Sequence, residues 1–415
     1  MKILYLLSDF PYPPTSGVRW KPFNLLNYMA RHHDCYVLSF GAPDALEQAT
    51  SWCQSLPRLC VLGLYPFPSG WRLRLMQIRH AIRGDPPSLA RVNGRDYVGG
   101  LRHALELYGC DIVHCDSLSL AQYLPIFEHL PTVLAPNDPP SLLYQRASAD
   151  NTNLFLKARF AFSWWRIAIY ERKVFPRFTK LHFVSNVDSS YVMSRYPELD
   201  IETIEIAVDG GFLEIPMDEQ TGMQDVRPVL FSSGVLSSEG IALPLIDFLR
   251  NDFGRIRDRV PGIEYVVIGR YSPPHISAFL KDQPGVTFLP WVENYVSSLS
   301  KATIAIFLDR VGTGIKNRVL QALAAGKATV GTSTAFEGLA VQDGVHALVC
   351  DVPGSARKAV LNLLEDPSLR QHLGEAAREL VKQHYTQEAT GKRWEALYDS
   401  AIAKSSRAHK STKPL

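Results

Sequence analysis

The chain has 415 residues, of which 46% are hydrophobic and 20% are charged, and its formal net charge is +3. This length exceeds the roughly 250–300 residues at which a single hydrophobic core stops growing, so we expect two domains. The composition excludes a disordered chain, and the small net charge argues against nucleic acid as the main partner.

No segment approaches the ~18 uninterrupted apolar residues of a transmembrane helix. The apolar run at 3–7 is too short for the core of a signal peptide and fits a first buried strand. The six cysteines form no CxxC pair, which is typical of reduced core thiols in a cytosolic protein. We therefore expect a cytoplasmic protein, either free or peripheral on the inner face of the membrane.

Apolar, strand-like runs alternate with helical patterns along the first half of the chain. The predicted strands are 2–7, 35–40, 58–64, 112–114, 132–135, 181–184 and 204–208. Predicted helices between them include 23–32, 97–108 and 154–178. Nearly continuous apolar strands that are separated by helices indicate a parallel sheet covered on both faces.

A second alternating series follows a polar stretch. Its predicted strands are 229–232, 265–268, 286–289, 303–308, 328–331 and 347–349, and its helices include 241–252 and 356–364. The sequence thus predicts an α/β protein with two doubly wound, Rossmann-like domains that face a central cleft. The expected parts are a first domain at 1–208 with the returning C-terminal helix 386–403, a linker at 209–225, a second domain at 226–385 and a mobile tail at 404–415.

Residues 312–326 form a glycine-containing loop and a helix between two predicted strands. Gly312 and Gly314 let the backbone approach a ligand without a Cβ in the way. The helix, which we expect to start near Ile315, directs its free N–H groups and positive end at that loop, where Lys316 adds a cation. This pattern favours a diphosphate site. The alternative is an ordinary turn whose glycines serve only its geometry.

The turn after the first strand, residues 8–19, is stiffened by prolines. Gly17 and the N–H groups after it form a second candidate phosphate contact, and the alternative is a rigid turn without a ligand. His114 and Asp116 end a buried strand and, by alternation, point to one side of it. They are candidates for orienting sugar hydroxyls or assisting proton transfer. The alternative for His114 is a core histidine that is hydrogen-bonded to its neighbour.

These motifs, in this order, resemble the retaining glycosyltransferases of the GT-B fold, family four, and especially their exopolysaccharide-associated branch. The resemblance covers roughly residues 1–400 and is carried by residues 3–17, 111–114, 170–173, 184–185, 312–326 and 336–339. It implies transfer of a hexosyl-type sugar from a nucleotide-sugar donor, with retained anomeric configuration, no bound metal and no further cofactor. The first domain would then bind the acceptor and the second the donor.

The resemblance also implies roles for individual residues, with Lys316 as the diphosphate cation and Gly17 approaching the donor phosphate from the first domain. The candidate catalytic residues are His114, Asp116 and Lys316. The candidate donor-binding residues are Gly17, Gly234, Ser237, Ser238, Gly269, Arg270, Arg310, Thr313, Gly314, Ile315, Lys316, Asn317 and Gln321. For Arg310 a salt bridge at the rim is an equal alternative.

The chain departs from the family pattern in three places. The family's paired glutamates fall on Thr313 and Gln321, and Val18 stands where the branch often has a second glycine. Residues 237–240 replace a segment that usually contains an arginine and a lysine. Charge on the donor diphosphate then rests mainly on Lys316.

The predicted helix at 154–178 is rich in aromatic and basic residues, and a second basic cluster surrounds Trp71. At 100° per residue, one stripe of the helix collects Arg159, Arg166, Lys173 and Arg177. Trp164 and Trp165 suit the headgroup level of a bilayer. One interpretation is a peripheral contact with an anionic membrane that carries a lipid-linked acceptor. The other is a solvated charged stripe.

The leading hypothesis is a transferase that uses a nucleotide-sugar donor and a sugar or lipid-linked acceptor to make a cell-surface polysaccharide or glycolipid. A second hypothesis keeps the transfer but uses a soluble small-molecule acceptor. A third is a non-catalytic nucleotide-sugar-binding protein, supported by Thr313 and Gln321. A Rossmann dehydrogenase is disfavoured because no GxGxxG follows the strand at 2–7.

Overall fold

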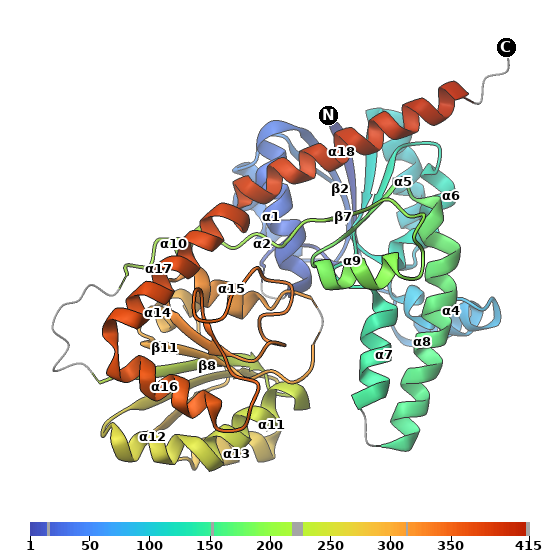
Figure 1. Ribbon diagram of the computed structural model, residues 1–415. Coiled ribbons are helices and arrows are strands. Elements are labelled where there is room, and N and C mark those ends of the chain that lie inside the picture. The colour runs from blue at the N-terminus through green and yellow to red at the C-terminus, as the bar shows by residue number, and fades with distance from the viewer. Residues whose placement is uncertain (15–16, 151–152, 218–226, 313, 412–415) are drawn as a thin grey trace. The chain divides into compact units, whose positions relative to one another are not determined.

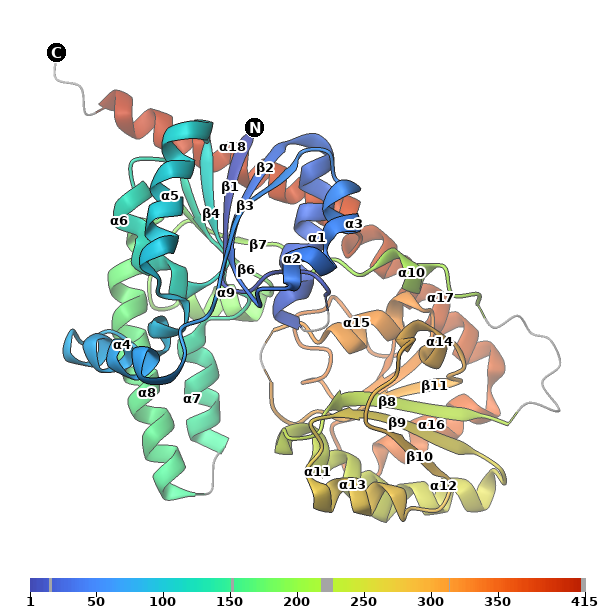
Figure 2. The same ribbon diagram turned by 180° about the vertical axis from the view of Figure 1, so that it is seen from behind.

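The computed structural model describes residues 1–14, 17–150, 153–217, 227–312 and 314–411, and it divides into two compact units (Figures 1 and 2). Unit 1 comprises Met1–Ala207 and the C-terminal residues from Gln387, and unit 2 comprises Val208–Thr386. Each unit is a parallel sheet with helices on both faces. The expected α/β class with two doubly wound domains is therefore confirmed.

The sheet of unit 1 has seven parallel strands in the order β3-β2-β1-β4-β5-β6-β7. Its strands are β1 (Lys2–Leu7), β2 (Asp34–Phe40), β3 (Leu59–Tyr65), β4 (Ile112–Cys115), β5 (Thr132–Leu134), β6 (Lys180–Phe183) and β7 (Ile201–Thr203). The strand order reverses between β1 and β4, so this pair is the switch point of the sheet.

Alternate residues of β1 enter two different cores. Leu4 and Leu6 belong to one apolar cluster, whereas Ile3, Tyr5 and Leu7 belong to the other, and all five are fully buried. A strand with core on both faces must be apolar throughout. This is why the first strand could be predicted from an uninterrupted apolar run.

Helices cover both faces of this sheet. They are α1 (Gly17–His32), α2 (Ala45–Gln48), α3 (Thr50–Gln54), α4 (Gly70–Ile82), α5 (Arg95–Tyr108), α6 (Leu124–Phe127), α7 (Pro140–Asp150), α8 (Leu154–Val174), α9 (Asn186–Met193) and α18 (Gln387–Ser411). The first begins at Gly17, earlier than the predicted 23–32, and includes Pro22. The helix tolerates that proline near its N-terminus, where few intrahelical hydrogen bonds are lost.

The C-terminal helix α18 packs against β1 and α1. Its Trp394, Leu397 and Tyr398 share a core with Tyr5, so the predicted return of this helix to the first domain is confirmed. The helix continues to Ser411, beyond the predicted end at 403. Lys404 Nζ donates hydrogen bonds to the carbonyl oxygen of Thr179 and to Asp200 Oδ2, at 3.2 and 3.0 Å, which anchors part of this extension.

Unit 2 repeats the plan with a sheet in the order β10-β9-β8-β11-β12-β13. Its strands are β8 (Val229–Val235), β9 (Glu264–Arg270), β10 (Val286–Leu289), β11 (Ile304–Phe307), β12 (Ala328–Gly331) and β13 (Leu348–Val349). Its helices are α10 (Gly210–Leu213), α11 (Glu239–Phe248), α12 (Gly254–Arg259), α13 (Pro274–Lys281), α14 (Tyr295–Ser300), α15 (Asn317–Ala324), α16 (Ser355–Glu365) and α17 (Pro367–His384). The switch point lies between β8 and β11.

Two further predicted boundaries differ from the structure. The strand expected at 204–208 is β7, which ends at Thr203, and Asn24 Nδ2 donates to the carbonyl oxygen of Ala207 in the segment that follows it. A side chain thus replaces a neighbouring strand as the partner of this backbone group. The helix expected near Ile315 is α15, which begins at Asn317 with Lys316 as its N-cap residue.

Gly374 of α17 marks the tightest backbone approach in unit 2. A Cβ at this position would lie 2.1 Å from the carbonyl oxygen of Gly326. We expect Gly374→Ala to destabilise unit 2 by about 1–3 kcal/mol, because a backbone atom has no rotamer with which to yield. Urea unfolding followed by circular dichroism measures the shift.

Gly254→Ala is the matched control in the same unit. Gly254 is helical, with φ −56° and ψ −44°, and a Cβ there meets no atom within 4 Å. The added methyl should leave stability unchanged or raise it by up to ~1 kcal/mol. Equal unfolding midpoints for the two variants would contradict the packing argument.

Candidate functional site

The loop between β11 and α15 carries the strongest candidate site. Gly314 has φ +61°, a left-handed conformation that glycine adopts without strain. A Cβ on Gly312 would lie 3.1 Å from Lys316 Cε, so this glycine leaves room for the lysine to fold over the loop. The loop glycines therefore serve both the turn and the placement of Lys316. Thr313, the candidate sugar contact, lies outside the described residues.

Lys316 holds its ammonium group at the start of α15. Its Nζ donates to the carbonyl oxygen of Gly314 at 2.9 Å and lies 3.6 Å from Glu337 Oε2. The two side chains are 9% and 16% exposed. An ammonium group carries a full positive charge and three hydrogen-bond donors, so it is a chemical group suited to an anion. Together with the N–H groups of the first helical turn, it creates a local positive potential.

The neighbouring candidates on α15 differ in how their side chains are placed. Ile315 is 9% exposed and packs in the core of unit 2, so only its backbone is suited to a ligand contact. Asn317 opens the helix and Gln321 lies one turn later, both partly exposed. Gln321 keeps a carbonyl acceptor and an amide donor for a hydroxyl-bearing ligand, but it has no charge.

The glycines near the carboxyl ends of β8 and β9 are explained by close packing. Gly234 pairs with Gly269 across the two strands. A Cβ on Gly234 would lie 2.9 Å from Ile241 Cγ2, and one on Gly269 would lie 2.2 Å from Leu236 Cδ1. Arg270 ends β9, and its carbonyl oxygen accepts a hydrogen bond from Leu236 N at 2.9 Å. Two turns at the carboxyl edge of the sheet are thereby locked together.

The serines of this region lie at the start of α11. Ser237 is exposed, whereas Ser238 is the N-cap residue of the helix. The carbonyl oxygen of Ser238 accepts hydrogen bonds from Ile241 N and Ala242 N at 3.1 and 2.9 Å. Its role in the structure is thus to start the helix, and donor contact stays a prediction for both serines.

Two arginines near this edge have different environments. Arg310 is 60% exposed and pairs with Asp247 at 2.9 Å, which is the rim salt bridge that the sequence left as an alternative. Arg318, which the sequence analysis missed, is 16% exposed, pairs with Asp309 and lies over the Phe307 ring at 5.2 Å. Arg318, Asp309 and Phe307 are among the residues that line a cavity of about 20 Å³ at the ends of β8 and β11, whereas Arg310 is not. In the sequence, the signal for this ion pair was Asp309, which directly follows the buried strand predicted at 303–308.

In unit 1 the candidate His114 lies inside the core. It is fully buried, its Nδ1 lies 2.8 Å from Tyr398 Oη, and its ring packs near Tyr5 and Trp394. Burial lowers the pKa of His114 well below its usual value. This is the environment of the core-histidine alternative, so contact with a substrate would require the helix α18 to move. The catalytic role of His114 stays a prediction that this burial disfavours.

Asp116 lies at the switch point of the same sheet, where it bridges the ends of β1 and β4. It accepts hydrogen bonds from Ser8 N and Ser8 Oγ at 2.9 and 3.3 Å. Burial raises the pKa of Asp116 to about 7, although the Lys21 ammonium and the Ser8 hydrogen bonds act in the opposite direction. Burial likewise lowers the pKa of Lys21 to about 8. A buried carboxyl and a buried amine therefore lie together, and the sequence analysis did not identify Lys21.

A salt bridge holds the start of the helix that begins at Gly17. Gly17 is the first residue of α1. Arg19 makes a bidentate contact with Asp9, from Nε to Oδ2 at 2.9 Å and from Nη2 to Oδ1 at 3.1 Å. This pair joins the start of the helix to the end of β1, and a phosphate contact at Gly17 stays a prediction.

Within the ranges that the structure describes, no group of three or more His, Cys, Asp and Glu side chains is placed to hold a metal ion. All six cysteines are free thiols.

Glu171, from the motif at 170–173, connects α8 to α7. It is 1% exposed, and its Oε1 accepts a hydrogen bond from Ser141 N at 3.0 Å. Burial raises the pKa of Glu171 to about 7, against the hydrogen bonds from Ser141. This motif residue therefore has a structural role in holding the two helices together.

The raised pKa of Glu171 predicts how the free energy of unfolding of unit 1 depends on pH. Because the pKa is higher in the folded state, the folded protein keeps a proton between about pH 4.5 and 7 that the unfolded chain has lost. The resulting stabilisation is complete below that range and is lost as the pH rises toward 7, by at most about 1.4 kcal/mol per pH unit. Glu171→Gln retains an oxygen acceptor but does not titrate, so its stability relative to wild type should rise with pH.

Urea unfolding followed by tryptophan fluorescence measures this difference, since six of the seven tryptophans lie in unit 1. The exposed Glu198→Gln is the control and should show a constant difference from wild type. A constant difference for Glu171→Gln as well would contradict the raised pKa.

Comparison with known proteins adds to this geometry. Residues 228–366 match the family model described as glycosyl transferases group 1, which covers most of unit 2. Comparison with curated protein sequences gives no significant match.

Solved structures share the fold over nearly the whole chain. A glycosyltransferase from Rickettsia africae ESF-5 is 12% identical, with a TM-score of 0.64 and coverage of 97% of this chain and 98% of its own. Sucrose-phosphate synthase from Thermosynechococcus elongatus is 14% identical, with a TM-score of 0.66 and coverage of 97% and 100%. Anabaena HepE in complex with UDP-glucose is 12% identical, with a TM-score of 0.65 and coverage of 96% and 100%. The fold is therefore that of the GT-B glycosyltransferases, and the family match in unit 2 supports a glycosyltransferase.

Proposed function

We propose that the protein is a retaining glycosyltransferase that moves a hexosyl-type sugar from a nucleotide-sugar donor to an acceptor in cell-surface polysaccharide or glycolipid synthesis. The observation that carries the proposal is the ammonium group of Lys316 at the start of α15, inside the segment that matches the glycosyltransferase family. The complex of Anabaena HepE with UDP-glucose supports a nucleotide-sugar donor. No metal or further cofactor is part of this proposal.

The chemistry required of the site is stabilisation of a leaving diphosphate. The bond between the anomeric carbon and the diphosphate oxygen breaks, a bond to an acceptor oxygen forms, and the proton of the acceptor hydroxyl passes to the leaving diphosphate. Negative charge grows on the diphosphate during this step, so preorganised positive groups lower the barrier. Lys316 supplies a full charge and the first turn of α15 supplies oriented N–H groups.

Glu337 has a positioning role in this proposal. It lies 3.6 Å from the Lys316 ammonium and, with the Gly314 carbonyl, holds that group over the loop. A lysine side chain that is already ordered loses less conformational entropy when a ligand binds. Gln321 would contact sugar or ribose hydroxyls through its amide.

Lys316→Ala should abolish transfer and weaken nucleotide binding. Loss of a charge-assisted contact worth about 1.5–3 kcal/mol corresponds to a 10- to 100-fold higher Kd. The donor is first chosen by thermal stabilisation with a panel of UDP-, GDP-, ADP- and CMP-sugars. Calorimetric titration with that donor and with its nucleoside diphosphate then measures binding, and release of nucleoside diphosphate measures turnover.

Lys301→Ala is the matched control, since Lys301 is an exposed lysine at the end of α14. It should leave binding and turnover unchanged. Unchanged turnover in Lys316→Ala would refute the site. Binding by the wild type without hydrolysis or transfer would instead favour the non-catalytic alternative, and transfer to a water-soluble acceptor would favour the second enzyme hypothesis.

A further inference from the structure

Helix α4 presents an apolar stripe to solvent. Its Trp71, Leu75, Ile78 and Ile82 follow each other at intervals of four, three and four residues, which places them on one face of a helix. They are 72%, 58%, 56% and 81% exposed. A surface helix of a globular domain normally turns such a stripe toward its core. Here the stripe faces outward and needs a partner.

Helix α8 has an exposed apolar stripe of its own. Phe155, Phe162, Trp165 and Ile169 repeat at intervals of seven, three and four residues and are 77%, 56%, 55% and 47% exposed. The buried residues of the same helix, among them Ile167 and Val174, belong to the core of unit 1. Burial of this second stripe therefore has to come from outside the unit.

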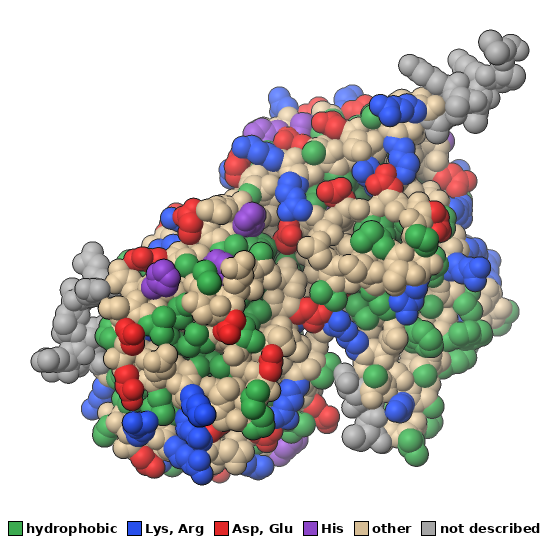
Figure 3. All heavy atoms as spheres, in the orientation of Figure 1, with side chains coloured by type: hydrophobic (Ala, Val, Ile, Leu, Met, Phe, Trp, Pro, Cys, Tyr) green, Lys and Arg blue, Asp and Glu red, His purple; other side chains and the backbone are tan. Residues whose placement is uncertain are grey.

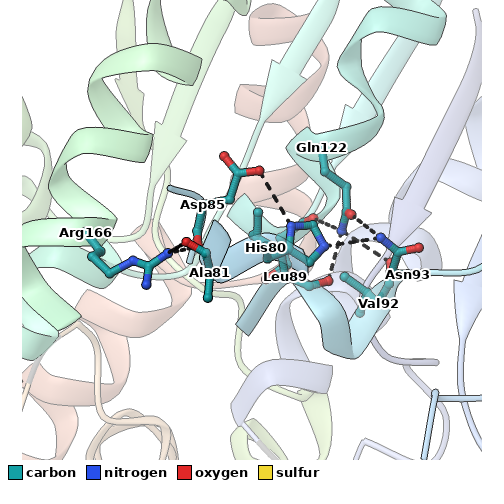
Figure 4. A network of polar contacts seen from close by, with 9 residues as sticks. His80, Ala81, Asp85, Leu89, Val92, Asn93, Gln122 and Arg166 are labelled. Carbon is teal, nitrogen blue, oxygen red and sulfur yellow. Dashed lines mark hydrogen bonds and ion pairs between the residues drawn. The ribbon is translucent and has the colours of Figure 1, made fainter. Parts of the chain in front are cut away.

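A polar network joins the two helices (Figure 4). Arg166 Nη2 of α8 donates to the carbonyl oxygens of Ala81 and Asp85, at 3.2 and 2.5 Å, and so bonds to the end of α4. On the other side of α4, Asn93 Nδ2 lies 3.3 Å from His80 Nε2 and donates to Gln122 Oε1 at 2.9 Å. These hydrogen bonds hold α4 and α8 together, and Arg166 has a structural role in them. We call the exposed face of the two helices, which carries both apolar stripes, the α4–α8 surface.

The exposed charges of these two helices all have the same sign. No acidic residue occurs in α4, and Glu171, the single acid in α8, is buried. The exposed basic residues of the two helices are Arg72, Arg74, Arg79, Lys157, Arg159, Arg172 and Lys173. Figure 3 shows apolar and basic side chains gathered over the region where Figure 1 draws α4 and α8.

We propose that the α4–α8 surface docks unit 1 onto an anionic lipid bilayer. Exposed tryptophans and aliphatic side chains partition into the interfacial layer, and the surrounding lysines and arginines meet anionic headgroups. No described helix is long and apolar enough to cross a membrane, so the two helices lie along its surface. A second copy of the chain fits less well, because pairing this surface with itself would bring like charges together.

The docking surface is independent of the proposed transferase activity. Combined with that activity, it indicates an acceptor that is itself anchored in the membrane, because the surface would hold unit 1 where such an acceptor lies. The sequence predicted a membrane contact at 154–178, and that contact is part of the present proposal. That prediction counted Arg166 and Arg177 as free basic residues, but Arg166 bonds to α4 and Arg177 pairs with Glu128.

Co-sedimentation with vesicles tests the proposal. The full chain is mixed with vesicles of phosphatidylcholine alone or of phosphatidylcholine and phosphatidylglycerol at about 7:3, in low salt and in about 0.5 M salt. We expect binding to the anionic vesicles, much weaker binding to the neutral ones and partial release by salt. Two double variants, Ile78→Ser with Trp165→Ser and Arg74→Glu with Lys173→Glu, should each lower the bound fraction at least tenfold.

The matched controls carry the same changes elsewhere on the surface. Leu107→Ser with Val352→Ser removes two apolar side chains that are 60% and 70% exposed, and Arg255→Glu with Lys358→Glu reverses two exposed charges. Both control proteins should bind vesicles as the wild type does. Circular dichroism confirms that all variants are folded, and nucleotide binding without vesicles should be equal in all of them.

Several results would overturn the docking surface. The wild-type protein would then fail to bind anionic vesicles, or the variants of the α4–α8 surface would bind them as strongly as the wild type does. Concentration-dependent dimerisation that the Ile78→Ser and Trp165→Ser changes abolish, without vesicle binding, would assign the surface to a second copy of the chain. Since nucleotide binding is measured without lipid, failure of the docking surface remains distinguishable from failure of the proposed enzyme activity.

Discussion

Burial of both sheets on both faces is the constraint on which the rest of the structure depends. Parallel strands with core on each side are predominantly apolar along their length. Polar and charged groups therefore concentrate where strands end. In unit 1, Ser8 and Asp116 follow β1 and β4, and in unit 2, Gly234 and Asp309 lie at the ends of β8 and β11. In each unit these two strands form the switch point of the sheet.

The two switch points use different chemistry. In unit 1 the pair is closed by a buried carboxyl group that accepts hydrogen bonds from Ser8, close to a buried amine. In unit 2 the corresponding edge carries glycine turns, the Arg318–Asp309 pair and the Lys316 ammonium at a helix start. The second arrangement has the positive groups that the proposed function requires, and it lies within the segment that matches the glycosyltransferase family model.

Much of the fold could be predicted from the sequence because buried parallel strands are continuous apolar runs with sharp ends. The strands at 2–7, 286–289 and 328–331 were predicted to the residue. The glycine loop before Lys316 could be predicted because close backbone approach and positive φ both select glycine. Boundaries failed where tertiary partners decided them, as at β7 and at the end of α18.

The contacts of individual side chains could not be predicted in the same way. Residues distant in sequence, such as Lys21 and Asp116 or Lys316 and Glu337, meet only in the folded chain. Arg166 looked like a surface charge because helical spacing says nothing about the neighbouring helix, to which it bonds. The exposed stripe of α4 likewise has the pattern of a core-facing helix, and only its exposure in the folded chain shows the difference.

A crystal structure of the protein with a nucleoside diphosphate tests the central claim most directly. The account predicts phosphate oxygens within about 3 Å of Lys316 Nζ and of the backbone N–H groups in the first turn of α15. A diphosphate bound elsewhere, with no phosphate oxygen near Lys316 Nζ, would contradict it.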